Sequence, residues 1–277
     1  MKPTVYLVGS GPGSIDLLTL RAYRKIVSAD CLMVDALVSD EIIALATHAK
    51  IISVGKRAIR TRANQAAAES PTKRENKPCM QQADINTILV EQGLDAQNKG
   101  QTVVRLKGGD PLIFARAEEE ISALNQAGIA FEIIPGISAV QAAHAQLKQP
   151  MTRRGVQRAL VIATPQVQSG DTIGIAWARP LVAAGGGAIY MAATAASRIK
   201  GTLLALGLAA STPVTWVADA GRPGTAIFKQ HLETLCAPPA QPNAALILLV
   251  GTESQAWTSS SILGVSQHLP QPAQSSV

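Results

Sequence analysis

Short apolar segments that end in glycine alternate with segments of helical spacing along the first half of the chain. Predicted strands at residues 4–8 and 102–106 run directly into glycine clusters at 9–13 and 108–109. Further strands are predicted at 31–34, 51–54 and 131–134, and helices at 17–29, 40–49 and 115–127. Since strands and helices alternate, the sequence predicts an α/β fold with a largely parallel sheet.

The second half of the chain spaces its strands differently and predicts a separate α/β domain. Strands are predicted at 159–163, 187–191, 214–218 and 246–250, with a helix at 195–206. The predicted domains span residues 1–135 and 136–251. Segment 61–82 is polar and is interrupted by prolines, which predicts a mobile surface loop. Segment 252–277 is rich in Ser, Gln and Pro, which predicts a disordered tail.

Composition limits the class of protein. The 277 residues are 47% hydrophobic and 16% charged, which is enough to build a substantial core. No segment approaches the roughly 20 apolar residues of a membrane span, and the first residues lack the apolar core of a signal peptide. Cys31, Cys79 and Cys236 form no Cys-x-x-Cys pair and the histidines are dispersed. We therefore expect reduced thiols, a cytoplasmic protein, no membrane association and no bound metal.

Basic residues are concentrated in two groups, and the net charge is +6. The first group is Lys56, Arg57, Arg60, Arg62, Lys73, Arg74 and Lys77, and the second is Arg153, Arg154 and Arg158. Such patches favour an anionic partner, for example a small polycarboxylate. Aromatic residues are only 3% and form no base-stacking platform, which argues against nucleic acid. A solvated face with no partner is the remaining interpretation.

The first glycine cluster differs from a dinucleotide-binding turn. That fingerprint requires a glycine at its sixth position, where this chain has Ser14. Pro12 also removes a backbone N–H where a diphosphate would need a donor. The pattern therefore predicts a tight turn, either purely structural or beside another kind of ligand, and makes a nicotinamide oxidoreductase the least favoured enzyme class.

The second glycine cluster, residues 105–111 (Arg-Leu-Lys-Gly-Gly-Asp-Pro), has more of the features of a ligand site. Gly108 and Gly109 follow a predicted strand and allow the backbone to approach a ligand closely. Asp110 offers a carboxylate that could accept hydrogen bonds from hydroxyl or ammonium groups. The loop follows the carboxyl end of a strand, where open α/β sheets bind ligands. A helix-capping role for Asp110 is an equal alternative.

Together these segments resemble the tetrapyrrole methylase family. The matching pieces are the runs at 8–13, 54–57, 104–111 and 134–139, together with Asp35, Leu37, Val38, Ser39, Tyr190, Met191 and the final strand up to Gly251. The resemblance covers residues 4–251. Val-Gly-Lys-Arg at 54–57 and Arg-Leu-Lys-Gly-Gly-Asp-Pro at 105–111 are most typical of the uroporphyrinogen-III branch of that family.

The resemblance implies two α/β domains, usually in a homodimer, with S-adenosylmethionine in the cleft between them. The residues that would contact this cofactor are Pro12, Gly108, Gly109, Asp110, Ile113, Ser138, Ala139, Met191 and Ala220. Asp35 would act as general base and Lys56 as proton donor. The carboxylates of an anionic tetrapyrrole would be bound by Arg57, Arg116, Arg153 and Arg154.

The implied reaction is C-methylation of uroporphyrinogen III at two ring carbons to give precorrin-2, for sirohaem or cobalamin formation. Methylation of another tetrapyrrole, or binding of tetrapyrrole or cofactor without turnover, are the alternatives. The residues have simpler interpretations too: Asp35 as a helix cap, Lys56 as a carboxylate clamp, Met191 as core packing and Arg116 as a surface charge.

The sequence departs from the family pattern at several positions. Ala115 and Ala117 replace glycines, so the turn there should stiffen or the next helix should extend. Arg153 stands where the family has a histidine, and residues 164–166 (Thr-Pro-Gln) replace a Thr-Gly-His turn. The pattern therefore supports cofactor binding more strongly than it supports the identity of the substrate.

Overall fold

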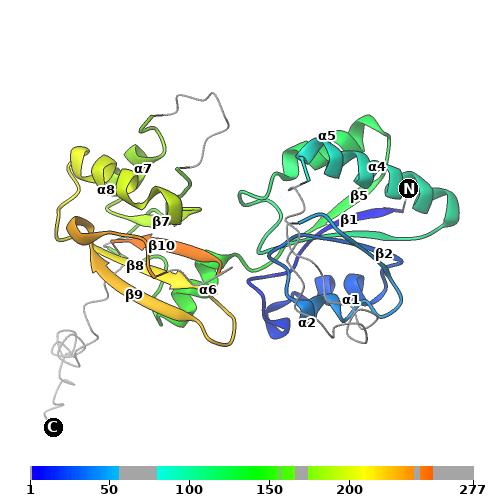
Figure 1. Cartoon of the computed structure of the whole chain (residues 1–277), viewed down its shortest axis with the longest axis horizontal. Helices are drawn as coiled ribbons and strands as arrows, with labels where there is room; N and C mark the ends of the chain where they lie inside the picture. Colours follow the sequence, from blue (N-terminus) through cyan, green and yellow to red (C-terminus); the bar gives the residue numbers. More distant parts are fainter. Residues whose placement is uncertain (1, 56–79, 156, 166–173, 240–243, 252–277) are drawn as a thin grey trace, which may run out of the picture.

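The computed structural model describes residues 2–55, 80–155, 157–165, 174–239 and 244–251. Two five-stranded sheets lie side by side, each covered by helices (Figure 1). The first sheet has the order β3-β2-β4-β1-β5, and every pair in it is parallel. Its strands are β1 (Val5–Gly9), β2 (Cys31–Val34), β3 (Lys50–Ser53), β4 (Val103–Lys107) and β5 (Phe131–Ile134). The parallel sheet predicted from the first half of the sequence is therefore confirmed.

Alternate residues of the central strands pack on opposite faces of the parallel sheet. Tyr6, Val8 and Leu32 contribute to a core with α1 (Leu20–Val27) and α2 (Asp40–Ile43). Val5 and Met33 contribute to a second core with α4 (Gln82–Lys99) and α5 (Ala117–Gln126). Because both faces are covered, β1 and β2 are buried at every position and do not alternate apolar with polar residues, as is usual for parallel sheets.

Three predicted helices are shorter in the structure. The first begins at Leu20, because Thr19 is extended and its side chain accepts from the Ala22 N–H, and it ends at Val27. The helix predicted at 40–49 ends at Ile43, since the backbone then continues in three-residue turns. The helix predicted at 115–127 spans only Ala117–Gln126, because Arg116 has a left-handed backbone with φ of 55°. Helix α4 was not predicted.

The second sheet is mixed, with the order β6-β7-β10-β8-β9. Only β6 and β7 are parallel, and the other pairs are antiparallel. Its strands are β6 (Ile162–Ala163), β7 (Gly187–Tyr190), β10 (Leu246–Val250), β8 (Pro213–Ala218) and β9 (Ala226–His231). The strand predicted at 159–163 is thus reduced to two residues, and β9 was not predicted.

Helices cover both faces of the second sheet. Helices α7 (Ala178–Ala183) and α8 (Ala196–Ala205) pack on the face that carries Ile189 and Trp216. Helix α6 (Ala139–Gln146) packs on the opposite face. Helix α6 follows the last strand of the first sheet yet packs on the second. The boundary near Gly136 stays a prediction. None of the described helices is both long and apolar enough to cross a membrane.

Candidate active site

The loops at one edge of the parallel sheet form one side of the candidate site. Strands β1, β2, β4 and β5 are parallel, so the loops that follow them emerge at the same edge. These loops carry Pro12, Asp35, Gly108 and Ser138. The two glycine clusters, which follow β1 and β4 in the sequence, therefore lie close together in the structure.

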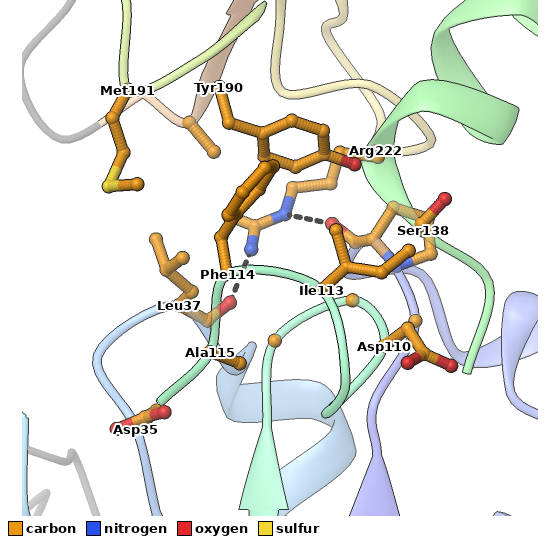
Figure 2. A pocket seen from close by; sticks show the side chains of 16 residues that line it. Asp35, Leu37, Asp110, Ile113, Phe114, Ala115, Ser138, Tyr190, Met191 and Arg222 are labelled. Atoms are coloured by element: carbon orange, nitrogen blue, oxygen red, sulfur yellow. Dashed lines mark hydrogen bonds between the residues drawn. The ribbon is translucent and has the colours of Figure 1, made fainter. Parts of the chain in front are cut away.

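An edge of the second sheet forms the other side. Strands β7 and β8 are both antiparallel to β10, so the ends of β7 and β8 lie beside the start of β10. Met191 follows β7, Arg222 lies in the turn after β8, and Ala245 precedes β10. Residues that are far apart in the second half of the chain thus face the loops of the parallel sheet (Figure 2).

A cavity lies between these two edges. Its lining residues come from both sheets: Gly11, Pro12, Asp35, Leu37, Gly108, Gly109, Asp110, Ile113, Phe114, Ala115, Ser138, Ala139, Tyr190, Met191, Arg222 and Ala245. Eight of the nine residues that the sequence predicted around a cofactor line it, the exception being Ala220. Ala220 is buried in the core beside α6 and does not reach the cavity lining.

Three glycines hold the loops of the parallel sheet against one another. Gly11 and Gly109 exchange backbone hydrogen bonds of 3.1 and 2.7 Å. A Cβ atom on Gly136 would lie 2.2 Å from the Gly109 carbonyl oxygen, so no side chain fits there. At Gly109 itself the backbone φ is 68°, which favours glycine, and an added Cβ would meet only the Ser138 Cα, at 4.0 Å. Close packing therefore requires glycine at position 136, whereas the space beside the Gly109 Cα is open to a ligand.

The Asp110 carboxylate joins two of these loops. Its Oδ1 accepts from the Leu112 N–H at 2.8 Å, and its Oδ2 accepts from the Gly136 N–H at 3.0 Å. Asp110 does not cap a helix, because α5 begins only at Ala117. A carboxylate can accept about four hydrogen bonds, so each oxygen of Asp110 keeps capacity for a ligand.

Aromatic and apolar side chains form the wall opposite the glycines. The rings of Phe114 and Tyr190 lie 5.4 Å apart at an angle of 55° (Figure 2). The Tyr190 hydroxyl accepts from the Val140 N–H at 3.1 Å, and burial raises the pKa of this hydroxyl. Phe114 and Met191 both have left-handed backbones, with φ of 50° and 53°. Met191 is 44% exposed, so it belongs to the cavity and not to the core.

Asp35 lies at the floor of the cavity. Its Oδ1 accepts from Arg105 Nη2 at 3.1 Å, and its side chain remains 32% exposed. Helix α2 begins after Ser39, with no side-chain cap, so Asp35 is not a helix cap. The arrangement leaves a carboxylate that is oriented by one arginine and accessible from the cavity (Figure 2).

None of the three predicted substrate-binding arginines that the structure describes lines the cavity. Arg116 is exposed and pairs with Glu119, at 3.0 Å from Nε and 2.8 Å from Nη2. Arg153 forms a backbone bridge with Gln157, and Arg154 is exposed in the turn between them. Lys56 and Arg57 lie outside the described residues, as do Cys79 and most of segment 61–82.

Arg222 is a site residue that the sequence did not indicate. Its Nε donates to the Pro12 carbonyl oxygen at 3.0 Å, and its Nη2 donates to the Leu37 carbonyl oxygen at 2.6 Å. A Cβ atom on Gly13 would lie 2.0 Å from Arg222 Nε, so the last glycine of the first cluster makes room for this side chain. In the sequence, Gly13 was the only nearby indication of this contact, and a glycine alone does not show which distant residue packs against it.

Comparison with known sequences gives a consistent set of relatives. A family model described as Tetrapyrrole (Corrin/Porphyrin) Methylases matches residues 4–236. A uroporphyrinogen-III C-methyltransferase of Paracoccus denitrificans is 37% identical over 248 residues, covering 89% of this chain and 79% of that protein. Siroheme synthase 2 of Serratia proteamaculans is 35% identical over 90% of this chain. The chain spans only 48% of that synthase, about half its length.

Solved structures agree with the sequence relatives. The native form of a uroporphyrin III C-methyl transferase from Thermus thermophilus has a TM-score of 0.70 at 26% identity, covering 89% of this chain and 91% of that chain. The Thermus thermophilus enzyme complexed with S-adenosyl homocysteine has a TM-score of 0.70 at 28% identity, covering 88% and 96%. The similarity therefore extends over both sheets.

Proposed function

Because the chain belongs to the tetrapyrrole (corrin/porphyrin) methylase family, we propose that it transfers methyl groups from S-adenosylmethionine to two ring carbons of uroporphyrinogen III, giving precorrin-2. The relative from Paracoccus denitrificans is named for uroporphyrinogen-III C-methylation, and the chain covers 79% of it. The activity of a whole siroheme synthase is not part of this proposal, since the chain matches only about half of such a protein.

The cavity between the two sheets is the observation that carries the proposal. It gathers glycine turns from two loops of the parallel sheet and apolar side chains from the second sheet. A cleft with backbone groups on one side and an apolar wall on the other suits a ligand that has both polar and apolar parts. S-adenosylmethionine is such a ligand, and its demethylated form is bound by the similar Thermus thermophilus protein.

The residues around the cavity fit this cofactor. Gly109 leaves open space where a side chain would otherwise project. Asp110 retains acceptor capacity for hydroxyl or ammonium groups, and Ile113, Phe114 and Met191 offer apolar surface. When bound, the cofactor supplies an electrophilic methyl group on a sulfonium. No metal is required for this chemistry.

The work of the chain's own residues is positioning and proton removal. Methyl transfer is an in-line displacement, for which correct placement of the two reactants can supply about 7–11 kcal/mol. The substrate carbon becomes part of a cationic ring, and loss of a proton restores neutrality. Asp35, partly exposed at the cavity floor, is the proposed base, and such assistance is typically worth about 10²–10⁴-fold in rate.

The remaining roles are inferred from the family resemblance. Uroporphyrinogen III carries eight carboxylates, and Lys56, Arg57, Arg116, Arg153 and Arg154 are the proposed partners for them. Of these, the three described arginines lie outside the cavity, so they would contact the substrate's periphery. We also expect a homodimer in the cytoplasm.

The test is an anaerobic assay of the purified protein with uroporphyrinogen III and S-adenosylmethionine. Absorbance and product mass are followed together. A product heavier by two CH₂ units is expected, since each methyl group gained accompanies the loss of one proton. Absence of methylation, with S-adenosylhomocysteine binding measured in parallel, would exclude this substrate. The same assay with other tetrapyrroles would then distinguish a different methylase from a protein that binds without turnover.

A further inference from the structure

Three charged side chains are buried together beneath the cavity floor. Arg105 and Lys107 lie on the same face of β4, two positions apart, and Glu120 lies on α5. Arg105 and Lys107 are each 1% exposed, and Glu120 is 0% exposed. None of the three lines the cavity, so a direct role in ligand binding does not explain them.

One oxygen of Glu120 holds both cations. Glu120 Oε1 lies 2.8 Å from Lys107 Nζ and accepts from Arg105 Nε at 3.0 Å. The Arg105 Nη2 atom is also 3.0 Å from this oxygen. A buried ion is costly unless it is paired and hydrogen-bonded, so Glu120 is the group that makes the burial of Arg105 and Lys107 tolerable.

The pKa of Lys107 is shifted by the same groups. Burial lowers the pKa of Lys107, and the neighbouring Arg105 lowers it further, whereas Glu120 opposes both effects. Within this cluster Arg105 and Lys107 carry two positive charges, and Glu120 carries one negative charge. Arg105 also contacts a second carboxylate, that of Asp35 at the cavity floor.

Arg105 connects the buried carboxylate to the cavity. Its Nη2 lies between Glu120 Oε1, at 3.0 Å, and Asp35 Oδ1, at 3.1 Å. Its Nη1 donates to the Leu106 carbonyl oxygen at 3.2 Å. A guanidinium is planar and rigid, so holding Nε and Nη2 against Glu120 also fixes the direction of the other N–H of Nη2, which points to Asp35. Removing the buried contact would release the group that orients Asp35.

We infer that Glu120 is a positioning residue, which acts through Arg105 to hold the Asp35 carboxylate toward the cavity. The inference rests on the proposed function, in which Asp35 removes the proton from the methylated ring. Glu120 does not touch either reactant. Its effect should therefore appear in the chemical step and not in cofactor affinity.

The experiment compares Glu120→Gln with the parent and with Glu118→Gln. Glu118 is an exposed residue in the first turn of the same helix, so this variant is a matched control. We expect Glu120→Gln to lower kcat by about 10- to 100-fold, the cost expected for a displaced catalytic group. Its affinity for S-adenosylhomocysteine, measured by calorimetry, should stay within about twofold of the parent, since none of the cavity-lining residues changes. A parallel loss of affinity would overturn the inference.

A double-mutant cycle separates positioning from a general structural role. If Glu120 acts through Asp35, Glu120→Gln should cost little further activity in an Asp35→Asn background. An equal cost in both backgrounds would contradict the inference. If Glu120→Gln does not fold, Glu120→Asp keeps the charge with a shorter reach, and the same cycle applies to it.

A crystal structure of the Glu120 variant provides a readout that does not depend on activity. The contact between Arg105 and Asp35 is expected to be broken or reoriented. An unchanged Arg105–Asp35 contact would overturn the inference even in an active enzyme. Conversely, if the parent does not methylate uroporphyrinogen III, the proposed substrate fails, while the crystal structure still decides whether Glu120 positions Asp35.

Discussion

Arg222 Nη2 donates to the carbonyl oxygen of Leu37 at 2.6 Å, although 185 residues separate the two in the chain. The same guanidinium donates from Nε to the Pro12 carbonyl oxygen. One side chain from the turn after β8 thus holds two loops of the parallel sheet, and both loops line the cavity. The contact therefore joins the two sides of the cavity.

Replacing Arg222 with methionine should weaken both stability and ligand binding. The substitution removes hydrogen bonds from a charged donor, each worth about 1.5–3 kcal/mol. We expect the free energy of unfolding to fall by about 2 kcal/mol and the affinity for S-adenosylhomocysteine to fall by roughly tenfold, or about 1.4 kcal/mol. Denaturant titration and calorimetry measure these effects. Arg179→Met, on the exposed side of α7, is the control, and equal behaviour of the two variants would contradict the bridging role.

Replacing Asp110 with alanine should loosen the loop that follows β4. The backbone N–H groups of Leu112 and Gly136 would lose their acceptor, at a cost of about 1–3 kcal/mol in stability. Affinity for S-adenosylmethionine should fall as well, because the proposed acceptor for its hydroxyl or ammonium groups is removed. Asp110→Asn keeps one oxygen acceptor and should show smaller losses. An Asp110→Ala protein that binds the cofactor normally would exclude a ligand role for this loop.

Gly136 and Gly201 should respond oppositely to alanine. A Cβ on Gly136 would lie 2.2 Å from the Gly109 carbonyl oxygen, so the loops must separate, at a typical cost of about 1–3 kcal/mol or more. Gly201 lies within α8, and a Cβ there would meet no atom within 4 Å. Alanine should stabilise that helix by about 0.5–1 kcal/mol. Thermal unfolding of both variants tests the pair, and a tolerated Gly136→Ala would show that the loops are not closely packed.

The sequence predicted the strands that end at the cavity because they are apolar runs bounded by glycine. It failed where tertiary contacts decide the structure. Helix α4 was missed because only two of its five buried residues, Ile85 and Leu89, are large and apolar, and they alone give a weak apolar stripe. Strand β9 was missed because it has partly exposed residues and lies at the edge of its sheet, where β8 is its only partner among the described strands.

The site was predictable to the extent that local motifs form it. Asp110 and Gly109 stand in one short motif, and both line the cavity. Arg222 could not be predicted, because its partners are backbone oxygens 185 and 210 residues away, and any residue has such an oxygen. Ala115 and Ala117 did not extend α5, since the left-handed backbones of Phe114 and Arg116 keep the turn open.

Replacing Asp35 with asparagine should separate binding from chemistry. Asparagine keeps an oxygen that can accept from Arg105, so the local geometry and the affinity for S-adenosylhomocysteine should be retained. Methyl transfer should slow by about 10²–10⁴-fold, because the amide cannot take up a proton at neutral pH. Single-turnover assays with uroporphyrinogen III measure the effect. Full activity would show that Asp35 serves only to pair with Arg105.

His144 should make the protein less stable in mild acid. It is buried in α6 and its Nδ1 has no hydrogen-bond partner among the described residues. Burial lowers the pKa of His144, and a backbone contact with Gln149 only partly opposes this.

An imidazole with a lowered pKa binds its proton more weakly in the folded protein than in the unfolded chain. The free energy of unfolding should therefore fall as pH decreases below about 6.5, the usual histidine pKa, and continue to fall through the lower folded-state pKa. One such group contributes a slope of at most about 1.4 kcal/mol per pH unit. Urea titrations of the parent and His144→Leu at several pH values test this, with the exposed His48→Gln as control. Equal acid sensitivity in the parent and His144→Leu would show that other groups cause it.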